Sequence, residues 1–185
     1  MFIQTETTPN PATLKFLPGV TVMPEGTADY RSAGEAANSP LAQRLFQVHG
    51  VQAVFLGTDF VTVTKDDSVE WHLLKSSILG AIMEHLMAGL PVVEGADEGA
   101  AGAEDYAEAD AEIVSQIKEL LETRVRPAVA QDGGDIVFRG FDAGVVYLHM
   151  QGACAGCPSS TATLKHGIEN MLRHFVPEVN EVRPV

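Results

Sequence analysis

The chain has 185 residues, of which 45% are hydrophobic and 20% are charged, a composition typical of soluble globular proteins. It contains no run of 18 or more apolar residues, so the sequence predicts no transmembrane helix and no membrane partner. A formal net charge of −13 disfavours nucleic acid and anionic membrane surfaces as main partners. The first residues lack the patterns of a signal peptide and of a transit peptide, and we therefore expect no structural disulfides.

The negative charge is unevenly distributed along the chain. Residues 94–112 hold 8 acidic residues and no basic ones, whereas 1–93 hold 5 basic and 9 acidic residues and 113–185 hold 7 and 8. The central stretch consists mainly of Gly, Ala, Glu and Asp, which bury too little apolar surface to offset the entropy of the chain. The sequence therefore predicts a first domain, an acidic flexible linker and a second domain at residues 1–92, 93–111 and 112–185.

The first domain combines alternating strands with two helical stripes. Strands are predicted at residues 13–17, 51–56 and 60–65, the last two as a hairpin. A helix is expected to begin at Ser39-Pro40 and stop at Gly50, after a loop over residues 24–39. Apolar residues at helical spacing from Trp71 to Leu86 predict the second helix. We expect an antiparallel sheet with both helices on one face.

The second domain has the order helix, strand, strand, helix, strand. The first helix is predicted from Ile113 to Val125, with Pro127 closing or kinking it, and a tight turn follows at Asp132–Asp135. The remaining elements are predicted near residues 136–139, 145–150, 164–175 and 179–185. Both domains are thus expected to be small α+β sandwiches, the second with α-β-β-α-β order.

The only two cysteines, Cys154 and Cys157, lie two residues apart in a loop that contains Gly152 and Gly156. Pro158 stands where the following helix is predicted to begin, so the thiols precede a helix N-terminus, which favours negative charge. Thiolates are competent both for nucleophilic attack and for metal binding. This spacing predicts either a redox pair or part of a metal site, and it does not choose between iron–sulfur and zinc.

A zinc site or an iron–sulfur cluster usually needs four protein ligands, and one chain offers two cysteines. His149 lies on a strand, and His166 and His174 are eight residues apart on one helix, so none has the spacing of a third or fourth ligand. If the pair binds metal, the simplest completion is the same loop from a second copy of the chain. The competing hypotheses are a dithiol–disulfide oxidoreductase and a zinc-bridged dimeric adaptor.

Two sequence motifs resemble a known family. Asp132-Gly133-Gly134-Asp135, the hairpin, and the run from Gly152 to Thr161 with its helix resemble the C-terminal domain of NifU, the Nfu iron–sulfur scaffold domain, over residues 112–182. The run Phe2–Pro11 with Leu14-Lys15-Phe16 resembles the N-terminal domain of mitochondrial and alphaproteobacterial Nfu proteins. Together the two motifs, in this order, are more specific than the cysteine spacing alone.

The resemblance implies a non-enzymatic carrier that holds a [4Fe–4S] cluster, with [2Fe–2S] as the alternative, between two protomers. Cys154 and Cys157 are then the cluster ligands, and Gly152, Gly156 and the turn at Asp132–Asp135 are supporting positions. The implied partners are a second copy of the chain, apo iron–sulfur client proteins and upstream assembly factors. The first domain is expected to bind clients, and the acidic linker to let the cluster domain search for acceptor thiols. We expect a bacterial cytoplasmic location, or the mitochondrial matrix if the source is eukaryotic.

Overall fold

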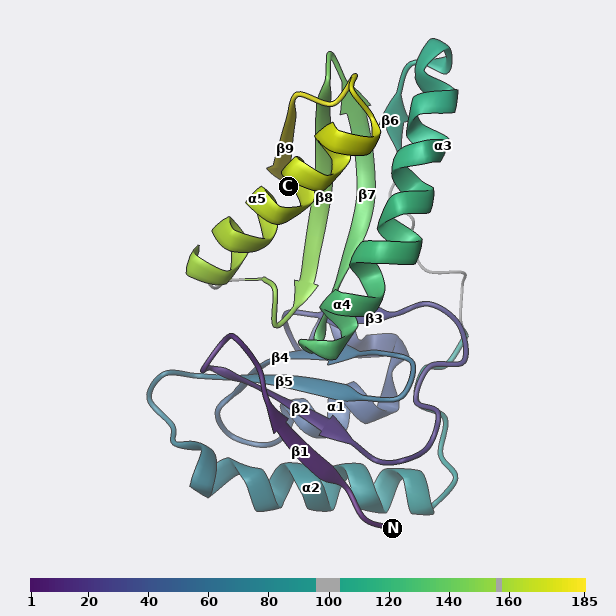
Figure 1. The fold of residues 1–185 in the computed structure, drawn as a ribbon. Coiled ribbons are helices and arrows are strands. Elements are labelled where there is room, and N and C mark those ends of the chain that lie inside the picture. Colours follow the sequence, from purple (N-terminus) through teal and green to yellow (C-terminus); the bar gives the residue numbers. More distant parts are fainter. Residues whose placement is uncertain (96–103, 156–157) are drawn as a thin grey trace. The chain divides into compact units, whose positions relative to one another are not determined.

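A computed structural model describes residues 1–95, 104–155 and 158–185, with the side chains of 158–160 left out. The chain forms two compact units, Met1–Ala100 and Ala101–Val185. Each unit combines a β-sheet with helices (Figure 1). The predicted α+β class is therefore confirmed. No helix among the described residues is long and apolar enough to cross a membrane.

The first unit is built on a five-stranded antiparallel sheet with the strand order β1-β2-β5-β4-β3. Its strands are β1 (Gln4–Thr7), β2 (Thr13–Leu17), β3 (Ala28–Tyr30), β4 (Val51–Leu56) and β5 (Val61–Lys65). The predicted hairpin is β4–β5, in which Val54 pairs with Val63 and Leu56 with Val61. β3 and a short helix, η1 (Glu35–Asn38), occupy part of the stretch that was predicted as a loop.

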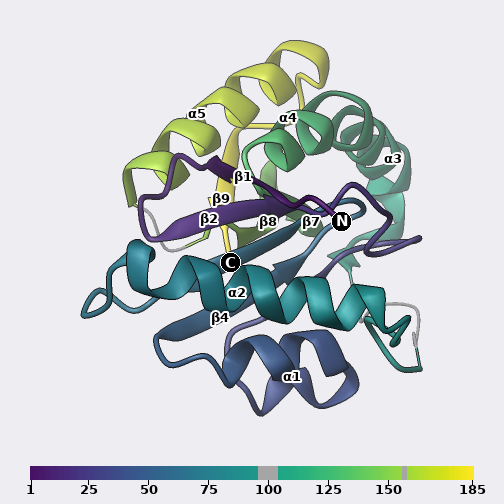
Figure 2. The same ribbon diagram turned by 90° about the horizontal axis from the view of Figure 1, so that it is seen from below.

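Two helices, α1 (Pro40–Phe46) and α2 (Trp71–Met87), cover one face of this sheet (Figure 2). Ser39 caps α1 as predicted, because its Oγ accepts a hydrogen bond from the Ala42 amide and donates one to the Val92 carbonyl. The core joins apolar side chains from both layers: Leu14, Phe16, Leu41, Leu45, Val54, Leu56, Val61, Val63, Leu74, Ile78 and Ile82. The layering of the first domain thus follows its predicted pattern.

The second unit has a mixed four-stranded sheet with the order β6-β7-β8-β9. The central pair, β7 (Gly134–Asp142) and β8 (Val145–Gly152), is an antiparallel hairpin with an irregularity between Phe138 and Gly140. β6 (Asp105–Tyr106) and β9 (Glu181–Pro184) each add to this hairpin in parallel. The hairpin therefore forms the centre of the sheet, and its open end leads into the cysteine loop.

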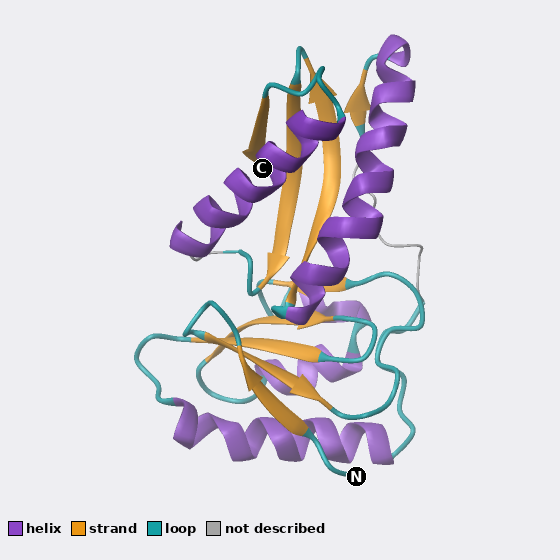
Figure 3. Ribbon diagram, in the orientation of Figure 1, coloured by secondary structure: helices purple, strands orange, loops and turns teal. Residues whose placement is uncertain are grey.

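The helices of this unit are one long run and α5 (Pro158–Phe175) (Figure 3). The long run comprises α3 (Ala111–Leu120), the π-helical segment η3 (Leu121–Val125) and α4 (Arg126–Gln131). It passes through Pro127, so of the two expectations for this proline, closing or kinking the helix, the helix does not close there, and an irregular π turn directly precedes it. A π turn takes an extra residue, and such irregular turns are where helices accommodate proline.

The structure differs from the predicted linker at its C-terminal end. Residues 104–111 belong to the second unit, because β6 pairs with β7, and η2 (Glu108–Asp110) leads into α3. Lys118 pairs with Glu104 at 2.6 Å, and the Tyr106 ring packs edge-on against Phe138. These contacts offset the entropy that composition alone assigns to the acidic stretch.

Candidate functional site

Cys154 lies directly after β8, at the end of the hairpin. β8 ends at Gly152, which has a φ of +65° and pairs with Gly134 at the start of β7. The amide of Ala153 then donates to the Gly133 carbonyl at 3.1 Å, and the amide of Ala155 donates to the Gly152 carbonyl at 3.1 Å. These bonds place Cys154 in a tight turn against the residues that precede β7.

The sulfur of Cys154 packs against Gly134. A Cβ atom at position 134 would lie 2.6 Å from Cys154 Sγ and 2.7 Å from the Gln151 carbonyl oxygen. Real Cβ atoms do not approach that closely, so a glycine is required here for steric reasons. Cys154 is a free thiol with only 6% of its surface exposed.

The following helix holds the loop from its other side. α5 begins at Pro158, as predicted, and Thr161 Oγ1 in its first turn donates to the Cys154 carbonyl at 2.9 Å. Cys157 and Gly156, predicted as a ligand and a supporting residue, lie outside the described residues. The described part of the site is therefore Cys154 with the turn before β7 and the start of α5.

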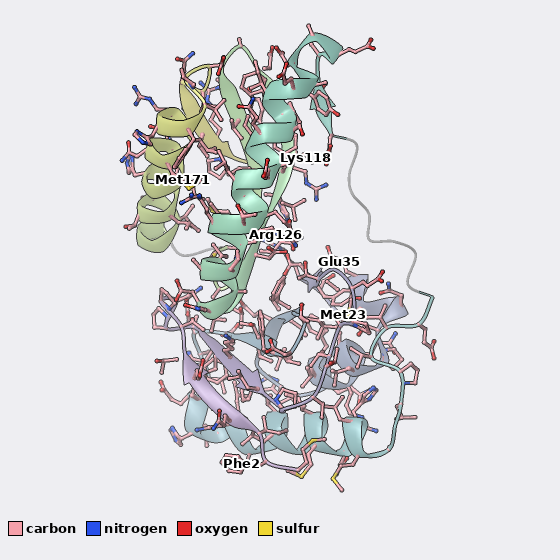
Figure 4. All side chains as sticks on the ribbon, turned by 45° about the vertical axis from the view of Figure 1, so that its right-hand side comes forward. Phe2, Met23, Glu35, Lys118, Arg126 and Met171 are labelled. Atoms are coloured by element: carbon pink, nitrogen blue, oxygen red, sulfur yellow. The ribbon has the colours of Figure 1, made fainter. Side chains whose placement is uncertain are left out.

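An ion pair between the half-buried Arg126 and the buried Asp135 joins the helical run to the start of β7. Arg126, labelled in Figure 4, donates from Nε and from a terminal nitrogen to the two carboxylate oxygens of Asp135, both at 2.9 Å. Asp135 is 4% exposed, and its Oδ1 also accepts the Ile136 amide at 2.8 Å. Glu122 accepts a further bond from Arg126 at 2.6 Å. Asp135 was predicted only as part of a supporting turn, and here it is a charged anchor for the start of β7.

Burial raises the pKa of the Cys154 thiol to about 12, and the negative charges of Asp132 and Asp135 act in the same direction. This differs from the expectation that a following helix N-terminus would favour a thiolate. In the ligand-free chain, Cys154 is therefore a protonated thiol at neutral pH. Metal binding would have to displace that proton, because the thiolate is the ligand.

Two of the described histidines contact backbone carbonyls. His149 Nδ1 lies 2.9 Å from the Val185 carbonyl, and the buried His85 lies 2.9 Å from the Pro91 carbonyl through Nε2. Within the described ranges, no three or more His, Cys, Asp or Glu side chains gather as they would around a metal ion. The described residues of one chain thus supply only Cys154 as a candidate ligand.

Sequence reasoning missed Arg126 and Thr161. The pairing of Arg126 with Glu122 is readable from their i, i+4 spacing, but its pairing with Asp135 depends on how the helix packs on β7. Thr161 offered no signal beyond its place in the motif after the cysteines. Both residues act on the loop through the tertiary structure.

Comparison with known proteins identifies both halves of the chain. Residues 3–89 match the family described as scaffold protein Nfu/NifU N terminal, and residues 117–183 match the NifU-like domain. A solution structure of a NifU-like protein from Saccharomyces cerevisiae aligns with 30% identity and a TM-score of 0.47, covering 51% of this chain and 86% of that one.

Similarity over the whole chain extends to relatives that are longer than this chain. The chain is 50% identical over 187 residues to the human NFU1 iron-sulfur cluster scaffold homolog, mitochondrial, covering all of this chain and 72% of the human protein. It is 52% identical to the protein of the same name from Drosophila erecta, of which it spans 65%. Because this similarity covers the whole chain at high identity, the chain belongs to the Nfu family of NifU-like iron–sulfur cluster scaffold proteins.

Proposed function

We propose that this protein holds an iron–sulfur cluster between two copies of itself and delivers it to apo-proteins. Cys154 and Cys157 of each chain supply the four thiolates of a [4Fe–4S] cluster, with [2Fe–2S] as the smaller alternative. The observation that carries the proposal is the ordered turn at Cys154. Its sulfur packs against Gly134, and its carbonyl accepts a hydrogen bond from Thr161 at the start of α5. A single chain offers too few ligands, which favours a shared site.

The protonation of Cys154 argues against the oxidoreductase alternative. A dithiol oxidoreductase attacks with a thiolate whose pKa is lowered, whereas burial and two nearby carboxylates raise the pKa of Cys154. A cluster site has no such requirement, because iron itself displaces the proton when it binds. Cys154 is thus suited to ligation rather than to nucleophilic attack.

Delivery is a ligand exchange without net oxidation or reduction. An acceptor thiol loses its proton to solvent and its thiolate binds iron, while Cys154 leaves the iron and regains a proton. No general base, nucleophile or phosphate loop is required, so the function is carriage rather than catalysis. Clients and upstream assembly factors are the protein partners that such exchange requires.

The first unit serves as the client-binding domain in this proposal. It contains no cysteine, and two of its buried polar side chains, Ser39 and His85, bond to backbone carbonyls. The acidic stretch between the units keeps a bound client near the cluster domain and raises the effective concentration of acceptor thiols. The relatives are named as mitochondrial, which favours the mitochondrial matrix for a eukaryotic source. For a bacterial source we propose the cytoplasm.

Anaerobic reconstitution with iron and sulfide tests the proposal. We expect a brown protein with about four irons and four sulfides per dimer, and dimerisation on loading, measured by metal and sulfide analysis with size-exclusion chromatography. Cys154→Ala and Cys157→Ala should each abolish loading. His149→Gln is the matched control and should load fully, since its imidazole contacts the Val185 carbonyl instead. Tight zinc binding without any sulfide would refute the carrier and support the zinc-bridged adaptor.

A further inference from the structure

Asp132 occupies an unfavourable position for a carboxylate. It is the C-cap of the long helical run that ends at Gln131, and its amide bonds back to the carbonyls of Val129 and Ala130. The C-terminal end of a helix carries partial negative charge, which an acidic side chain opposes. Asp132 therefore does not serve the stability of its own helix.

The two acids of the turn are not equivalent. Asp135 is buried and its charge is balanced by the bidentate contact with Arg126. Asp132 is exposed, and no ion pair joins it to a basic side chain among the residues that the structure describes. Of these two acids, Asp135 shares the cation of Arg126 with Glu122, whereas Asp132 has no ion-pair partner among the described residues.

That charge lies next to the cysteine loop. The residue after Asp132, Gly133, accepts the amide of Ala153, and the next residue, Gly134, contacts the Cys154 sulfur. Asp132 also contributes, after burial, to the raised pKa of Cys154, consistent with an electrostatic influence on the sulfur.

We propose that Asp132 is a release residue, whose negative charge weakens the hold of this chain on a bound cluster and so speeds its transfer. The inference rests on the proposed carrier function. Thiolate ligands outnumber the positive charge of the cluster core, so the loaded site is an anion. A fixed negative charge beside it raises the free energy of the bound state. When an acceptor thiolate replaces Cys154 on the iron, that repulsion is relieved, and a two-fold assembly would place one such charge on each side.

Asp132→Asn tests the proposal, with Asp142→Asn as the matched control. Asp142 is exposed at the far end of β7, so its substitution makes the same change in net charge away from the loop. Both variants are reconstituted with iron and sulfide, and cluster loss is followed in the presence of a ferrous-iron chelator. We expect Asp132→Asn to lose its cluster roughly two- to fivefold more slowly, a range set by the modest strength of exposed charge interactions. The difference should shrink as salt is added. Equal rates for the two variants would overturn the proposal.

Thermal unfolding of the cluster-free chain distinguishes release from a structural role. We expect Asp132→Asn to unfold at the same temperature as the starting chain or higher, because an acidic charge leaves a helix C-terminus. A lower unfolding temperature together with faster cluster loss would show a structural role and contradict the proposal. If the starting chain takes up no cluster at all, the proposed function fails as well. If it loads and transfers normally while Asp132→Asn behaves like Asp142→Asn, only this inference fails.

Discussion

Each unit of this protein contains a β-hairpin that leads directly into a long helix, and the two connections differ sharply. Between β5 and α2, the Ser68 amide donates to Asp66 Oδ1 at 2.8 Å, and Asp67 and Ser68 are exposed. Between β8 and α5, the Cys154 sulfur packs against Gly134. The next residue along β7, Asp135, is buried and pairs with Arg126. The same supersecondary unit thus contains an exposed connection in one domain and the candidate ligand Cys154 in the other. The difference lies in what the neighbouring strand and helix bring against it.

Separating the two units is the most severe test of this contrast. We expect a fragment of residues 104–185 to take up iron and sulfide to the same extent per chain as the full protein, because its core is its own. A fragment of residues 1–95 should take up none. Metal and sulfide analysis after desalting measures both. Comparable loading of the first fragment and of residues 1–95 would remove the functional distinction between the two connections.

The ion pair between Arg126 and Asp135 should give the next largest difference between the two units, in the free energy of unfolding. We expect Arg126→Met to lower the free energy of unfolding by about 2–4 kcal/mol, because it leaves the buried Asp135 carboxylate without its partner. Arg44→Met in the first unit is the matched control. Arg44 pairs with Glu84 at the surface, and its loss should cost less than about 1 kcal/mol. Urea unfolding compares the two, and equal losses would mean that the pair at the start of β7 is not special.

Replacing a glycine by alanine should change the stability in opposite directions in the two units, by smaller amounts than Arg126→Met. Gly134→Ala should destabilise the protein by about 1–3 kcal/mol, since its Cβ would collide with Cys154 Sγ and the Gln151 carbonyl. Gly80→Ala in α2 meets no atom within 4 Å and should stabilise by up to about 1 kcal/mol through helix propensity. Thermal unfolding of the two variants provides the comparison. A neutral Gly134→Ala would show that the loop can move away from β7 at no cost.

The protonation of Cys154 sharpens the contrast through its reactivity. In a Cys157→Ser chain without metal, we expect iodoacetamide to modify Cys154 at least about tenfold more slowly than in the denatured chain, because only the thiolate reacts. Folding raises the pKa of Cys154 from its ordinary value of 9.0 to about 12, so the folded chain holds the proton more tightly. The resulting stability is present below pH 9 and is lost as the pH rises toward 12. Equal modification rates in the folded and denatured chains would place the thiol in water.

The sequence predicted the elements of this fold better than their contacts. The hairpins, the start of α5 at Pro158 and the cap at Ser39 follow from patterns that are local in the chain. Strand β6 was not predicted, because its two residues lie in an acidic stretch and are ordered only by pairing with β7. The raised pKa of Cys154 differs from the expected preference for negative charge for a similar reason. A helix N-terminus is visible in the sequence, but burial and the carboxylates brought near by the turn are not.

The π-helical segment η3 also sets the rotational phase of the long helix. After Ile117, the buried residues of the long helix are Leu121, Val125 and Val129, each four positions apart. In a regular α-helix, each step of four residues exceeds a full turn by roughly 40°. The wider turn at Leu121–Val125 absorbs part of this drift, so the buried face stays on the sheet and Arg126 reaches Asp135. A deletion within 121–125 would remove no ligand and no charge of the loop. It would rotate α4 by about a quarter turn or more relative to the sheet. The angular register of a helix more than twenty residues before Cys154 therefore aligns the Arg126–Asp135 pair at the start of β7.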